Sequence, residues 1–136
     1  MRAVSLLPYA DFLGIRVEGE RGGAPLLVMP YSEGLIGFPG RLHGGAVSGL
    51  LEIAAIAAID ATLQEGEEAL AIFKPITVTV DFMRPGLPAD VYACGEVIRI
   101  GTRVANVSVS AWQDDPDRLI AAARMNLAIS PPVKSQ

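Results

Sequence analysis

The segment from Leu42 to Ile59 is almost entirely apolar or small, and it contains no proline. Alanine and leucine dominate it, so it predicts one long helix that runs to about Gln64 and is ended by Gly66. A helix that is apolar on every side has to be covered on most of its surface. The rest of the chain is therefore expected to wrap around this helix.

Segments with strand character flank the predicted helix on both sides. Before the helix, two short strands joined by a glycine turn are followed by a Gly/Pro-rich loop, at residues 11–21, 24–30 and 31–41. After the helix come four longer strands, at residues 76–82, 91–100, 103–112 and 118–129. The last three are separated by good turn signals, at Gly101–Thr102 and at residues 113–117. Along the first of the four, the apolar side chains alternate and share one face, at Ile76, Val78, Val80 and Phe82.

These patterns predict one domain over residues 1–136, of the α+β class. In the predicted architecture a curved antiparallel sheet wraps around one long hydrophobic helix. The chain is 51% hydrophobic and only 19% charged, which is apolar for a monomer. Part of its surface is therefore expected to be buried in a homo-oligomer.

Charge and cysteine content exclude several classes of function. A net charge of −4 gives no general basic surface to attract nucleic acid or an anionic membrane. One cysteine, Cys94, and one histidine cannot form an internal disulfide or a Cys/His metal cluster. Pro8 and Asp11 interrupt the first apolar run, which is unlike a signal peptide, and the polar residues within 42–59 favour a buried helix over a membrane span. We expect a cytoplasmic protein.

Glu52 is the one charged residue between Arg41 and Asp60, inside the predicted helix. An ionised carboxylate is costly in a dry environment, so this residue needs a reason to be there. It could take a proton from water or attack a substrate directly. Alternatively, it is a structural carboxylate that faces water or pairs with an arginine, such as Arg84 or Arg103.

His43 directly precedes Gly44 and Gly45 at the predicted helix start. The first N–H groups of a helix have no partner within the helix and carry the positive end of its dipole. Because neither glycine has a side chain, a substrate carbonyl could approach these amides, which would stabilise an oxyanion. The alternatives are tight helix–strand packing for the glycines, and a helix cap or an ordinary loop histidine for His43.

The run from Gly37 to Glu52, G-F-P-G-R-L-H-G-G-A-V-S-G-L-L-E, resembles the signature of hotdog-fold acyl-CoA thioesterases of the phenylacetate-pathway and 4-hydroxybenzoyl-CoA type. Residues 80–86, V-D-F-M-R-P-G, and residues 98–109 resemble later strands of that family. The resemblance implies a hotdog fold that hydrolyses an acyl-CoA to a carboxylic acid and free coenzyme A, without a metal or redox cofactor. It implies a dimer or a dimer of dimers.

The same resemblance implies roles for individual residues. Glu52, nine positions after His43, matches the catalytic acid, and the Gly44 amide would polarise the thioester with His43 beside it. The residues expected to contact coenzyme A, through its phosphates or pantetheine, are Gly45, Arg84, Thr102 and Arg103.

Helix geometry adds a constraint on how such a site is assembled. Gly44 and Glu52 are eight residues apart, so a helix places them roughly 12 Å apart along its axis. A base has to come within about 3 Å of its target, or act through one water. One chain cannot easily bring both groups to one carbonyl, whereas two antiparallel helices from two chains can. The resembled family builds its sites in this way, at a dimer interface.

Two positions depart from the family pattern, and other functions stay open. Gly37 stands where many relatives carry Asn or Gln, and Ile56 stands where relatives often carry Ser or Thr. The run 37–45 is also similar to the entrance of 3-hydroxyacyl-thioester dehydratases, but Gly37 stands where their catalytic histidine would be. A non-catalytic acyl-CoA-binding domain is a further alternative. Apolar residues near the motif predict a pocket for aryl or medium-chain acyl groups, at Leu35, Ile36, Phe38 and Ile56.

Overall fold

The computed structural model describes residues 7–63 and 72–130. The helices are α1 (Pro8–Leu13) and α2 (Gly44–Leu63), with a short 3₁₀ turn, η1 (Glu33–Leu35), before α2. The strands are β1 (Arg16–Arg21), β2 (Ala24–Met29), β3 (Ile72–Phe82), β4 (Val91–Ile100), β5 (Val104–Trp112) and β6 (Ala121–Ser130). The long helix and the six strands are confirmed, whereas Gln64 and Gly66, where the helix was expected to end, lie outside the described residues.

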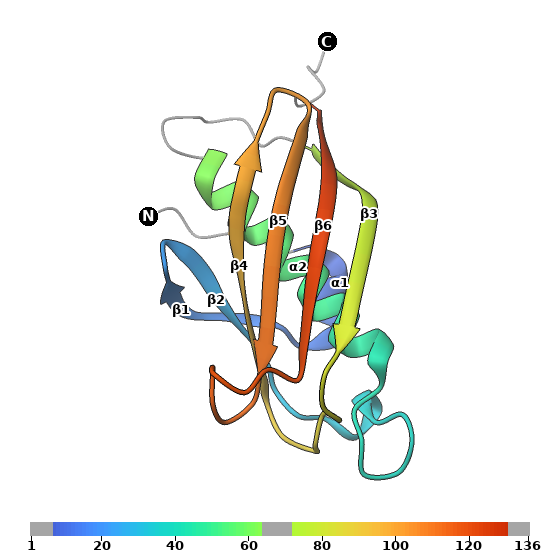
Figure 1. Cartoon of the computed structure of the whole chain (residues 1–136). Coiled ribbons are helices and arrows are strands. Elements are labelled where there is room, and N and C mark those ends of the chain that lie inside the picture. Colours follow the sequence, from blue (N-terminus) through green and yellow to red (C-terminus); the bar gives the residue numbers. More distant parts are fainter. Residues whose placement is uncertain (1–6, 64–71, 131–136) are drawn as a thin grey trace.

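The strands form one antiparallel sheet in the order β1-β2-β4-β5-β6-β3, and α2 lies across one face of it (Figure 1). This arrangement is the predicted α+β hotdog fold, with the sheet curved around a central helix. By length and composition α2 could cross a membrane, but most of it is buried inside the structure, as in a core helix. The strand after the helix, β3, forms an outer edge of the sheet.

The first predicted strand was partly wrong, because residues 8–13 form the short helix α1 and the strand begins only at Arg16. Pro8 stands in the first helical turn, where its missing N–H is not needed. Gly14 ends α1 in the left-handed conformation, with φ of 76°, which glycine adopts without strain. The buried side chains of Ala10 and Leu13 then attach α1 to the core.

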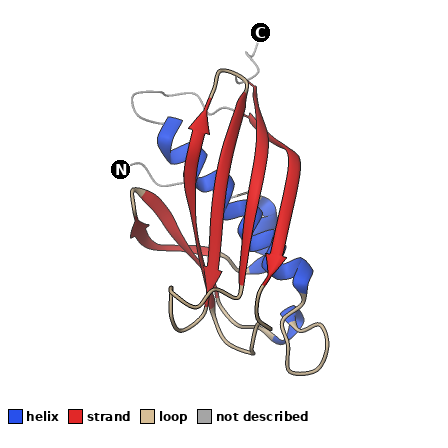
Figure 2. Ribbon diagram, viewed as in Figure 1, coloured by secondary structure: helices blue, strands red, loops and turns tan. Residues whose placement is uncertain are grey.

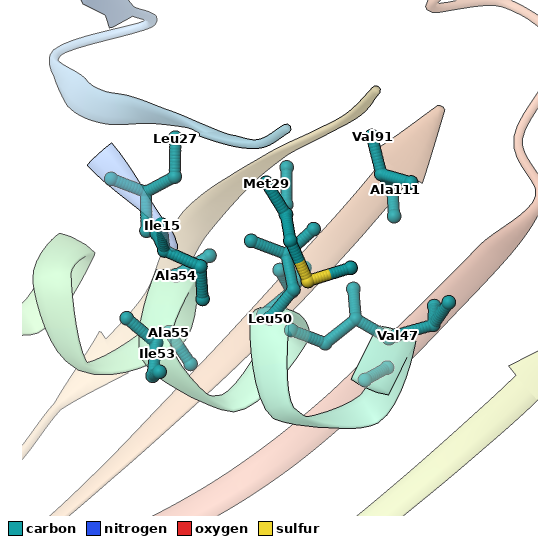
Figure 3. Packing of buried hydrophobic residues seen from close by; sticks show 14 of the residues in the cluster. Ile15, Leu27, Met29, Val47, Leu50, Ile53, Ala54, Ala55, Val91 and Ala111 are labelled. Atoms are coloured by element: carbon teal, nitrogen blue, oxygen red, sulfur yellow. The ribbon is translucent and has the colours of Figure 1, made fainter. Parts of the chain in front are cut away.

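The core lies between α2 and the inner face of the sheet. Leu50, Ile53 and Ala54 of α2 belong to one buried cluster with Leu27, Met29 and Val91 of the strands (Figure 3). Gly95 allows the closest approach, since a Cβ at this position would lie 2.9 Å from the carbonyl oxygen of Ala54 and 2.9 Å from Cβ of Ala58. The alanine-rich surface of α2 and a glycine in β4 thus bring the helix close to the sheet.

The inner face of β3 is covered far less than the rest of the sheet. Val80 is half-buried and packs against the core, but Val78 and Phe82 on the same face stay 42% and 57% exposed. Sequence alternation placed these side chains on one face, and the structure adds that α2 leaves much of that face open. Because β3 is also an edge strand, both its backbone edge and this apolar face are accessible in the single chain.

Replacing Gly95 with Ala should destabilise the fold, because the new methyl group would press on the backbone of α2. Overpacking of this kind typically costs about 1–3 kcal/mol. Urea unfolding followed by circular dichroism measures the loss. Gly19→Ala is the matched control, since a Cβ at this strand glycine has nothing within 4 Å. Equal stability of the two variants would contradict the tight contact.

Candidate active site

The start of α2 is capped by the side chain of His43. Its Nδ1 accepts a hydrogen bond from the N–H of Gly45 at 2.8 Å, while its own backbone N–H donates to the carbonyl of Leu35 at 2.7 Å. The N–H groups of Ala46 and Val47 donate to the carbonyl of His43, which begins the helical ladder. Within the described part of the chain, the Gly44 N–H makes no hydrogen bond. Of the two amides predicted to be available, Gly44 is therefore the free one, and Gly45 is engaged.

Two glycines make room for the His43 ring. A Cβ at Gly45 would lie 2.9 Å from Nδ1, and a Cβ at Gly37 would lie 3.0 Å from Cα of His43 and 3.3 Å from Cδ2. Gly37, one of the two departures from the family pattern, thus lies directly against this histidine. Because Nδ1 accepts a hydrogen bond, the proton of the neutral ring is on Nε2, which is left as a donor.

A pocket of about 710 Å³ opens in front of this helix start. The loops before α2 and after β3 gather at the same end of the molecule, as Figure 2 shows, and both contribute to the pocket. Its apolar lining includes Ile36, Leu42, Val47, Phe82 and Ile120. Its polar lining consists of His43, the Gly44 backbone and two arginines, Arg41 and Arg84, and none of the described residues that line it is acidic.

Glu52 lies outside this pocket, two helical turns along α2. It is half-buried, as are Ser48 and Ile56 one turn before and after it, so these three mark the side of α2 that the sheet leaves partly open. The sequence predicted a more deeply buried carboxylate. Among the described residues the ion pair is Arg16–Glu18, so the suggested pairing of Glu52 with Arg84 or Arg103 is not seen within the chain.

Thr102 and Arg103 lie at the opposite end of the sheet from Arg84. The carbonyl of Arg103 accepts from the N–H of Ile129, whereas the N–H of Arg84 donates to the carbonyl of Ile120. Ile120 lies directly before β6 and Ile129 lies near its end, so the two are nine residues apart, which corresponds to roughly 30 Å along a strand. Within one chain the structure therefore brings together His43, Gly44 and Arg84, but not Thr102 and Arg103.

Sequence reasoning missed two residues that shape the pocket. Arg41 lines it, and its place directly before the Leu42-His43-Gly44 run was a usable signal. Gln113 fixes the loop that carries Arg84: its Oε1 accepts from the N–H of Leu87 at 3.0 Å, and its Nε2 donates to the Leu87 carbonyl at 2.8 Å. No local pattern identifies such a long-range side-chain contact in advance.

Cys94 lies away from this pocket, on the outer face of β4. Partial burial raises the pKa of its thiol, an effect that the nearby positive charge of Arg21 opposes. Its Sγ donates to the carbonyl of Arg21 at 3.4 Å. A thiol with a raised pKa is a poor nucleophile, so Cys94 is a packing residue.

Comparison with known proteins identifies the family. Residues 37–128 match the family described as the acyl-CoA thioesterase N-terminal domain. The chain belongs to the acyl-CoA thioesterase family. The matched residues contain the whole pocket lining apart from Ile36, as well as Glu52, Thr102 and Arg103. Among curated proteins, none matches this chain.

Several solved structures share the architecture. A protein from Pseudomonas aeruginosa is 30% identical, with 90% of each chain covered and a TM-score of 0.76. A thioesterase from Haemophilus influenzae is 20% identical, with 94% of this chain and 86% of that chain covered, and a TM-score of 0.80. A phenylacetic acid degradation-related protein from Ralstonia eutropha is also 20% identical, with 91% and 92% covered and a TM-score of 0.76. At 20% identity the likeness establishes the fold.

Removing the His43 cap should lower the stability of this family member. Replacing a capping side chain with alanine typically costs about 1 kcal/mol, because the N–H of Gly45 loses its acceptor. His43→Asn should retain most of the stability, since its Oδ1 can accept the same hydrogen bond. Thermal melting of both variants measures the difference, and equal losses for Ala and Asn would argue against the capping role.

Proposed function

We propose that this protein hydrolyses an acyl-CoA thioester to a carboxylic acid and free coenzyme A. The observation that carries the proposal is that Gly44, whose N–H makes no hydrogen bond within the described residues, begins α2 at its positive end and lines a 710 Å³ pocket. Membership of the acyl-CoA thioesterase family supports thioester hydrolysis as the reaction. Water is the only co-reactant that this chemistry requires.

In the proposed reaction, the thioester carbonyl accepts a hydrogen bond from Gly44 N–H. As negative charge develops on that oxygen, the amide and the helix dipole stabilise it. Glu52 takes a proton from water while the water oxygen bonds to the acyl carbon, and the C–S bond then breaks. The proton on Glu52 passes to the departing sulfur, which regenerates the carboxylate. Direct attack by Glu52 on the acyl carbon is the alternative role for the same carboxylate.

The site is proposed to form between two chains. Gly44 and Glu52 of one chain are roughly 12 Å apart along α2, too far for both to act on one carbonyl. The half-buried side of α2 that carries Glu52, and the open edge and apolar face of β3, support pairing with a second copy. Glu52 of the partner subunit would then face the Gly44 amide. Two such dimers could assemble further into a tetramer.

The other predicted residues fit this proposal to different degrees. His43 offers its Nε2–H at the pocket, next to the Gly44 amide, as a second donor to the substrate. Thr102 and Arg103 remain predictions for coenzyme A contacts, and they could take part only through another chain. Gly45 could contribute backbone surface but not a free N–H.

The Glu52→Gln variant tests the catalytic carboxylate. Glutamine keeps the shape of the side chain but can neither accept a proton nor attack, so thiol release should fall by about 10²–10⁴-fold. Folding should be retained, because Glu52 makes no ion pair with any described residue. Melting temperature, acyl-CoA binding and thiol release are measured on the same sample. A stable variant with near-normal turnover would refute the role of Glu52, and wild-type protein that binds acyl-CoA without releasing thiol would indicate a binding domain.

The Gly44→Pro variant tests the amide and the shared site together. Proline is well tolerated at the first helical position and lacks the N–H, so thiol release should fall by about 10²–10³-fold with the fold retained. Co-expressing this chain with the Glu52→Gln chain, under two affinity tags, gives a heterodimer.

If sites are shared, that heterodimer regains one intact site, made of Gly44 from the Glu52→Gln chain and Glu52 from the other. If each chain holds its own site, every site stays defective. Sedimentation of the wild-type protein should show a dimer or larger. An active monomer, or an inactive heterodimer, would contradict the shared site.

A further inference from the structure

We propose that Arg41 and Arg84 form one oxyanion-binding site at the mouth of the pocket, which holds a negatively charged group of the substrate. The inference rests on the proposed acyl-CoA hydrolysis and names Arg41 as a binding residue. Both arginines line the pocket, from the loop before α2 and from the loop after β3. The group they hold is either the diphosphate of coenzyme A or a terminal carboxylate on the acyl chain.

The loop that carries Arg41 is held in a fixed shape. The N–H of Gly37 donates to the carbonyl of Arg41 at 2.9 Å, and the N–H of Arg41 donates to the carbonyl of Phe38 at 3.0 Å. Gly40 supplies the left-handed conformation that this closed loop requires, with φ of 78°. None of these contacts uses the Arg41 guanidinium, so the loop presents that group without depending on it.

Arg84 is held by the neighbouring loops. Its Nη1 donates to the carbonyl of Leu119 at 3.0 Å, and its backbone N–H donates to the carbonyl of Ile120 at 3.2 Å. One such bond fixes the guanidinium and leaves most of its five N–H donors for a ligand. The two arginine loops are joined directly, since the N–H of Leu42 donates to the carbonyl of Gly86 at 2.8 Å. The two positive charges thus come from adjacent, connected segments.

The charge of the site points to an anion. The protein carries a net charge of −4, yet this pocket has two arginines and none of its described lining residues is acidic. Neither guanidinium forms an ion pair with a described carboxylate, since the ion pair there is Arg16–Glu18. The two positive charges repel each other, which costs free energy. An oxyanion bound between them would offset this repulsion. Guanidinium groups bind phosphate and carboxylate with paired N–H donors.

Direct binding tests the site without relying on turnover. Calorimetry compares coenzyme A with pantetheine, which lacks phosphate, for the wild type and for Arg41→Gln and Arg84→Gln. Glutamine removes the charge, and at position 84 it keeps an N–H₂ donor for the Leu119 carbonyl. If the site holds the diphosphate, each variant should bind coenzyme A on the order of tenfold more weakly, with pantetheine unchanged. Arg124→Gln, on the outer sheet face, is the matched control and should behave as the wild type.

Kinetics on two acyl-CoA substrates tests whether the bound group is instead a terminal carboxylate on the acyl chain. If the site holds an acyl carboxylate, the variants should raise KM for adipyl-CoA on the order of tenfold and leave hexanoyl-CoA and coenzyme A binding unchanged. If neither coenzyme A binding nor the KM for adipyl-CoA changes in either variant, the oxyanion site is refuted. An equal loss of binding in the Arg124→Gln control would also refute the site, because the overall loss of one positive charge would then explain the weaker binding. Absence of turnover with intact arginine-dependent binding would refute the hydrolase and leave the site standing.

Discussion

The need to cover α2 is the constraint on which the rest of this structure depends. The sheet covers one side of the helix through close contacts such as Gly95 against Ala54, and α1 covers another part, where Tyr9 and Leu13 lie against Gly49. The side that carries Glu52 is left half-covered. Because most of the helix is buried, its first residue Gly44 is held at a defined place on the pocket wall.

Much of the fold could be predicted from the sequence, because the signals were local. The apolar run without proline identified α2, and alternation with turn residues identified the strands. Helix α1 was missed because its six residues are too few to show a helical period, although Pro8 and Gly14 mark its two ends. Alternation along β3 also says which side chains share a face, but not which element covers that face. That depends on where α2 crosses the sheet.

The parts of the candidate site formed by residues adjacent in sequence could be predicted. The parts that depend on contacts between distant segments were harder to predict. His43 and Gly44 are neighbours in sequence, and they line one pocket together with Arg84. The engagement of Gly45 by His43 needed the ring position, which no motif states. Arg41 was overlooked because one charge in a Gly/Pro-rich loop has no periodic signal. Thr102 and Arg103 were grouped with Arg84 by likeness of strands, whereas the antiparallel connections place them at the far end of the sheet.

The contact between Gly37 and His43 constrains how this sequence can change over time. A Cβ at position 37 would lie 3.0 Å from the backbone of His43, so a side chain there requires the loop to move by a few tenths of an ångström. Substitutions at the two positions are therefore not independent of each other. A chain with glycine here could acquire a larger side chain only if the loop shifted, so the order of the changes would decide whether each intermediate still folds.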